Sequence, residues 1–105
     1  MNMMKLMKQA QAMQKDVERV QAELAGKQVE FSSGGGMVSV TATGDGSVLA
    51  IKIDPKVIDP ADKELLEDMV LAAVDGAIKK GREMAAAEMQ KVTAGLGIPG
   101  LPGMR

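Results

Sequence analysis

The amino-acid sequence predicts an α+β protein with the element order α-β-β-β-α, in which two long helices flank a three-stranded antiparallel sheet. Three observations predict this fold. Apolar residues in the segment 2–25 recur at alternating steps of three and four, which is the spacing of a helix. The segment 27–54 instead alternates apolar and polar residues between glycine-containing turns. The segment 60–93 returns to helical spacing.

The first helix is expected to carry one continuous apolar seam. Neither Pro nor Gly interrupts it before Gly26, which is a plausible end signal. Such a seam is typical of a helix that packs lengthwise against another helix. The seam consists of Met3, Leu6, Ala10, Met13, Val17, Val20 and Leu24.

Three strands are expected at 27–33, 37–43 and 47–54, joined by the turn segments 33–36 and 44–46. Because the connections are short, the strands should form an antiparallel meander with one apolar and one mostly polar face. On the third strand, the apolar face is predicted to carry Leu49, Ile51 and Ile53.

The second helix is predicted to run from Pro60 to about Thr93, with Asp59 as its N-cap. Its middle contains a small-residue patch where another backbone could approach closely. We expect one domain over residues 1–94 and a flexible Gly/Pro-rich tail over 95–105. The small-residue patch comprises Ala72, Ala73, Gly76 and Ala77.

The predicted helices are longer than the predicted sheet. Strands of this length span about 25 Å, whereas the helices would span about 36 and about 50 Å. The core must also be built with one aromatic residue, Phe31, and ten Met among 105 residues. The overhanging seams should bury against each other or against a second subunit, which predicts a homodimer with projecting helical arms.

The composition argues against an enzyme, a metal site, a cofactor site and a small-molecule substrate. His, Cys and Tyr are all absent, and these residues serve much of acid–base, nucleophilic and zinc chemistry. The acidic pair Glu67 and Asp68 is better explained by the helix dipole than by catalysis. The glycines at 34–36 precede a strand and lack an adjacent Lys, so they suit a hairpin rather than a phosphate loop. No segment resembles a membrane span, and the absence of Cys fits a cytoplasmic protein.

Two basic clusters are the candidate DNA-contacting residues. The net charge is −1, so bulk charge predicts no nucleic-acid partner. In a single chain, each cluster is explained by an ordinary solvated helix face with mixed ion pairs. A dimer would duplicate both clusters on its arms, where they could straddle the phosphates of a duplex. The lack of aromatic residues argues against stacking on single strands. The candidates are Lys5, Lys8, Lys15 and Arg19 on the first helix and Lys79, Lys80 and Arg82 on the second.

Three segments together carry a resemblance to the YbaB/EbfC family of bacterial nucleoid-associated proteins. They are residues 4–14 (MKLMKQAQAMQ), 35–46 (GGMVSVTATGDG) and 51–55 (IKIDP), followed by an acidic helix start. The resemblance implies an α-β-β-β-α fold and a tweezer-like homodimer. It also implies binding to double-stranded DNA with little or no sequence specificity, a place in the cytoplasmic nucleoid, and roles in nucleoid organisation and gene regulation. Members of the family are not enzymes. This chain differs in lacking the Gly-rich lead often seen before the first helix.

The leading hypothesis is therefore a homodimeric, nucleoid-associated protein that binds duplex DNA and alters its conformation. The alternative is a protein-interaction adaptor whose Met-rich helices bind another protein without direct DNA binding.

Overall fold

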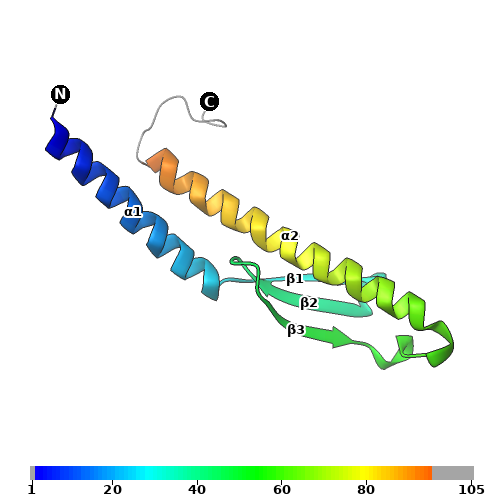
Figure 1. Cartoon of the computed structure of the whole chain (residues 1–105). Coiled ribbons are helices and arrows are strands. Elements are labelled where there is room, and N and C mark those ends of the chain that lie inside the picture. Colours follow the sequence, from blue (N-terminus) through cyan, green and yellow to red (C-terminus); the bar gives the residue numbers. More distant parts are fainter. Residues whose placement is uncertain (1, 96–105) are drawn as a thin grey trace.

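The computed structural model describes residues 2–95, which form two long helices and a three-stranded sheet (Figure 1). The element order is the predicted α-β-β-β-α, with short 3₁₀ turns in the connections. The molecule is elongated, with principal extents of 70 × 26 × 16 Å. Its radius of gyration is 19.5 Å, against about 13 Å for a compact domain of about 100 residues. Much of the surface that a globular fold would bury therefore lies open.

Helix α1 (Met3–Gly26) begins at Asn2, whose side-chain oxygen accepts a hydrogen bond from the backbone N–H of Lys5 at 3.3 Å. It lies beyond the end of the sheet, beside the C-terminal half of α2 (Lys63–Gly95) (Figure 1). Only Val20 and Leu24 of the seam are buried. The expectation that the two helices pack on each other is confirmed. The expected overhang is also present, because α1 reaches the sheet only at its C-terminal end, where Leu24 packs on the hairpin after β2.

The sheet has the order β1-β2-β3 and is antiparallel throughout, with β1 at Gln28–Ser33, β2 at Val38–Thr43 and β3 at Val48–Ile53. Positive φ angles at the turn glycines, such as 68° at Gly35 and 89° at Gly46, explain why these turns need glycine. The pairing of Val40 with both Phe31 and Ile51 places these three residues on one face.

The third strand departs from the predicted pattern at its start. Thr41 pairs with Ala50, but Ala42 pairs with Val48, so Leu49 is the extra residue of a β-bulge. The simple alternation that placed Leu49 on one face with Ile51 and Ile53 is therefore interrupted. The bulge lies next to the hairpin, where a local change in twist lets the strand leave the tight turn.

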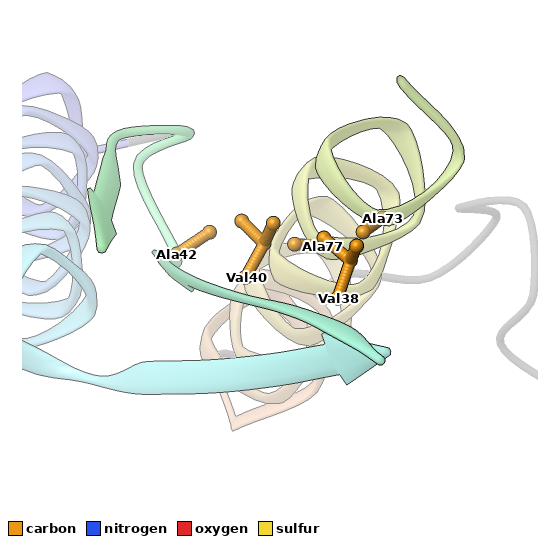
Figure 2. Packing of buried hydrophobic residues seen from close by; sticks show 5 residues of the cluster. All are labelled: Val38, Val40, Ala42, Ala73 and Ala77. Carbon is orange, nitrogen blue, oxygen red and sulfur yellow. The ribbon is translucent and has the colours of Figure 1, made fainter. Parts of the chain in front are cut away.

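The core lies between β2 and the N-terminal half of α2. Val38, Val40 and Ala42 of the strand face Ala73 and Ala77 of the helix (Figure 2), and all five are fully buried. Alanines at the contact let the helix lie close to the strand, which is the close approach that the small-residue patch predicted.

Two helix glycines extend this close packing. A Cβ atom at Gly81 would lie 2.5 Å from the backbone oxygen of Thr43, and one at Gly76 would lie 2.3 Å from the ring of Phe31. Each glycine costs a helix about 1 kcal/mol relative to Ala. The close contacts explain why these positions nevertheless hold Gly.

The start and end of the second helix differ slightly from prediction. Residues Pro60–Asp62 form a 3₁₀ turn, and α2 begins only at Lys63. The reason is a tight turn at Asp59, whose side chain accepts from the N–H of Ala61 at 3.0 Å while its carbonyl accepts from the N–H of Asp62 at 2.9 Å. At the other end, α2 includes Gly95, the first residue of the predicted tail. The rest of that prediction, over 96–105, falls outside the described residues.

Candidate nucleic-acid interface

The N-terminal half of α1 presents a basic stripe. Successive helix residues are turned by about 100°, which places Lys5, Lys8 and Lys15 within an arc of about 80°. That arc lies on the side opposite the apolar seam. The three side chains are exposed, and the segment 2–15 contains no Asp or Glu. Among residues 2–95, none of these lysines forms an ion pair. The stripe is therefore a local concentration of positive charge on a chain of net charge −1.

Arg19 continues the same stripe but is already paired. Its guanidinium lies 3.5 Å from a carboxylate oxygen of Asp16 and 3.4 Å from one of Glu23. Both pairs are exposed, so each is worth at most about 1 kcal/mol. Release of Arg19 to another anion would cost little, but its charge is neutralised in the free protein.

The basic cluster of α2 does not form one surface. Lys79 lies 2.9 Å from Asp75 in an exposed ion pair. Lys80 reaches back to the sheet and donates a hydrogen bond to the carbonyl oxygen of Glu30 at 2.9 Å. Arg82 is exposed on the side of the helix away from the core, and no ion pair joins it to any residue within 2–95. Lys79 and Arg82 are three residues apart and therefore neighbours on one exposed face of α2. The structure separates Lys80 from these two side chains.

The contact of Lys80 has a structural role. Glu30 belongs to β1, which is paired on one side only and leaves its other edge open. An unpaired strand edge can pair with another chain, and lysine is a common guard against this. The long side chain of Lys80 occupies one acceptor on the edge of β1.

Sequence reasoning missed a joint between the two helices. Glu88 of α2 lies 3.5 Å from the ammonium nitrogen of Lys27, just after α1, and 3.4 Å from that of Lys91. A hydrogen bond from Lys91, together with the nearby charge of Lys27, lowers the pKa of the Glu88 carboxyl from its ordinary value. The pair Glu88 and Lys91 is visible in the sequence at helical spacing, but the link to Lys27 depends on the tertiary fold.

Apolar side chains of β3 beside the core are left uncovered. Helix α2 lies over β1 and β2 and barely reaches β3. On β3, Ile51 and Ile53 face the same side as the core residues of β2, yet they are 45% and 36% exposed. The neighbouring side of α2 carries the half-buried Val74. Apolar patches of this kind mark interaction surfaces.

Other kinds of site have little support in the described part of the chain. Within residues 2–95, no group of three or more acidic side chains is arranged to hold a metal ion. Neither described helix is long and apolar enough to cross a lipid bilayer.

Comparison with known proteins identifies the family. The sequence model of the YbaB/EbfC DNA-binding family matches residues 1–96. This chain belongs to the YbaB/EbfC family. It is a DNA-binding family and not an enzyme family. The resemblance found in the sequence is therefore confirmed.

Curated relatives and a solved structure agree with this assignment. A nucleoid-associated protein of Acetivibrio thermocellus is 55% identical over 101 residues, covering 95% of this chain and 89% of the relative. A nucleoid-associated protein of Ruminiclostridium cellulolyticum is 52% identical, covering 98% and 88%. The crystal structure of an uncharacterized protein from Helicobacter pylori superposes with a TM-score of 0.63 at 25% identity, covering 85% of this chain and 98% of that one.

Proposed function

We propose that this protein is a homodimeric, nucleoid-associated protein that binds double-stranded DNA with little or no sequence specificity. Its membership of a DNA-binding family and its relatives' description as nucleoid-associated proteins support the assignment. The observation that carries the mechanism is the stripe of Lys5, Lys8 and Lys15 on the open face of α1, which forms no ion pair with any other residue of the range 2–95.

Contact with phosphates explains why the binding would lack sequence specificity. Lysine ammonium groups on a helix face neutralise backbone phosphates without reading base edges. The chain has a single aromatic residue, Phe31, and its ring packs against Gly76. It therefore offers no row of rings on which unpaired bases could stack, which favours duplex over single-stranded DNA.

The uncovered apolar surface of β3 and α2 supports the homodimer. A second copy that places the same surface against this one would bury Ile51 and Ile53, next to Val74, in an isologous contact. The edge of β3 is also open, because β2 pairs with its other side and all six of its residues are exposed.

The dimer would hold two arms, each made of α1 and the C-terminal half of α2. Each arm repeats the basic stripe, so two rows of lysines can bind one duplex at separated phosphates. Rigidly connected contacts of this kind favour DNA shapes that satisfy both rows at once. This is the proposed basis for altered DNA conformation, nucleoid organisation and gene regulation.

A DNA titration across salt concentrations, combined with sedimentation of the free protein, tests the proposal. We expect a dimer in sedimentation and retardation of unrelated duplexes with similar affinity. Affinity should fall steeply as salt rises, because bound phosphates release counterions. Absence of retardation at low salt would contradict DNA binding. If, in addition, a protein partner were retained from nuclease-treated extract in stoichiometric amount, the function as a protein-interaction adaptor would replace the proposed DNA-binding function.

A further inference from the structure

The apolar seam of α1 continues past the end of α2. Lys91 and Val92 of α2 line the same groove as Asp16 and Val20 of α1, and the two helices run antiparallel. Because both helices advance by about 1.5 Å per residue, Gly95 lies close to the level of Met13. The first turns of α1 therefore project beyond the end of α2, as Figure 1 shows.

This projecting part of the seam is uncovered. Met3 is 72% exposed and Leu6 49%, and Met7 beside them is 59% exposed, whereas Val20, further along the seam, is 5% exposed. The difference follows from position, since α2 covers Val20 and ends before it reaches Leu6. A helix with an open apolar face on its outer turns is poorly stabilised, because most helical stability in proteins comes from packing of that face.

The chain that follows α2 has the composition and reach to cover it. Residues 96–105 leave α2 at the inner end of the open seam. Ten residues span up to about 33 Å when extended, whereas the seam from Met13 to Met3 is about 15 Å long. Two prolines and three glycines exclude a helical continuation, and the one charged side chain is Arg105. Apolar side chains recur at Leu96, Ile98, Leu101 and Met104.

We propose that residues 96–105 dock along the projecting apolar seam of α1 in the same chain. A covalent link this short gives the segment a local concentration in the millimolar range, which favours its own α1 over that of another copy. The docked segment covers the side of α1 opposite Lys5, Lys8 and Lys15. It therefore stabilises the helix that carries the basic stripe without covering the stripe. The inference concerns folding of the arm and does not rest on DNA binding.

Hydrogen exchange on the protein without DNA tests the docking. Deletion of residues 96–105 should raise amide exchange of the segment 3–13 at least fivefold, because a frayed helix loses its protection. Exchange of β2 is the internal control and should not change. Unchanged exchange of 3–13 after deletion would overturn the proposal.

Matched variants separate apolar packing from chain length. Replacement of the four apolar residues with Ser should raise exchange of 3–13 as the deletion does, whereas Gly97→Ser, Gly100→Ser and Gly103→Ser together should not. In a background of Leu6→Gln with Ala10→Gln, the deletion should add no further effect. The docking would be contradicted if the apolar-to-Ser and Gly-to-Ser variants raised exchange of 3–13 equally. It would also be contradicted if the deletion raised this exchange as much in the Leu6→Gln, Ala10→Gln background as in the unaltered chain.

Cross-linking identifies the chain that supplies the segment. The sequence contains no Cys, so Met7→Cys with Leu101→Cys introduces a single possible pair per chain. Oxidation should give a cross-link within one chain, which leaves the denatured mass unchanged. A cross-link formed only between two chains would overturn same-chain docking and assign the seam to a second copy.

Discussion

The two halves of α2 pack in different ways. The N-terminal half lies on the sheet through Ala73 and Ala77, and the strand residues beneath are fully buried. The C-terminal half lies against α1, where only Val20 and Leu24 are buried and ion pairs such as Lys27–Glu88 join the helices. Close apolar packing thus stabilises the sheet half, while the arm half keeps its charged residues on the surface. Changes in the two halves should affect different measurements.

The largest expected effect concerns assembly through the sheet half. Ile51→Glu would place a charge in the proposed dimer interface and should weaken dimerisation at least about 100-fold, or about 2.7 kcal/mol. Sedimentation equilibrium measures this change. Lys52→Glu, on the opposite face of the same strand, is the control. Equal sedimentation of the two variants would argue against a dimer through this face.

The next largest effect concerns the free energy of unfolding, which should depend more on the sheet half than on the arm half. Val40→Ala should lower the free energy of unfolding by about 2–3 kcal/mol, because it leaves a cavity at a fully buried position. Met13→Ala, on the arm, should cost less than about 1 kcal/mol because Met13 is only half-buried and its neighbours can collapse around it. Urea denaturation compares the two. A larger loss for Met13→Ala would reverse the comparison.

The close approach of α2 to the sheet predicts a smaller loss of stability, from a Gly-to-Ala change that would ordinarily stabilise a helix. Gly81→Ala should destabilise by about 1–2 kcal/mol, although Ala favours helix, because the new Cβ would meet the backbone oxygen of Thr43. Gly26→Ala, where a Cβ meets nothing within 4 Å, should be neutral or slightly stabilising. Thermal unfolding would distinguish them, and a stabilising Gly81→Ala would disprove the close approach.

The smallest effect is a pH dependence of the arm. The pKa of Glu88 is lowered in the folded state, first by the hydrogen bond from Lys91. Its ion pairs therefore contribute fully above the ordinary carboxyl value of about 4.5 and are lost as pH falls through the lowered value. Exchange of the amides near Lys27 should rise in this acid range. In Glu88→Gln the acid-induced rise should be smaller, and an identical rise in both proteins would exclude this group as its cause.

Much of the fold was predictable because it is recorded in local patterns. The helical seam around Val20, the alternation around Val40 and the turn glycines each follow from spacing within a few residues. The position of α1 beyond the sheet was not predictable in this way, because helix length does not say against which element a seam packs. The bulge at Leu49 was also missed, since one extra residue leaves no distinctive sequence pattern.

The candidate site likewise contains features that local spacing predicts and features that depend on the tertiary fold. The lysines at positions 5, 8 and 15 share a face through helix geometry alone, and the pair Asp75–Lys79 follows from helical spacing. The hydrogen bond from Lys80 to Glu30 joins residues 50 apart in the sequence, so only the tertiary fold brings it about. The tertiary fold therefore turns Lys80 away from Lys79 and Arg82, although the three are close in sequence.

The central claim is that DNA binds to the arm and not to the sheet half. It is tested most directly by the salt dependence of DNA affinity in two triple variants that remove the same charge. Lys5→Gln, Lys8→Gln and Lys15→Gln together should weaken binding. They should also make the negative slope of log affinity against log salt shallower by about 0.9 for each phosphate that is no longer neutralised. Lys52→Gln, Lys56→Gln and Lys63→Gln together, on the sheet half, should leave affinity and slope nearly unchanged. Equal reductions in the two variants, or a larger reduction in the second, would contradict the account.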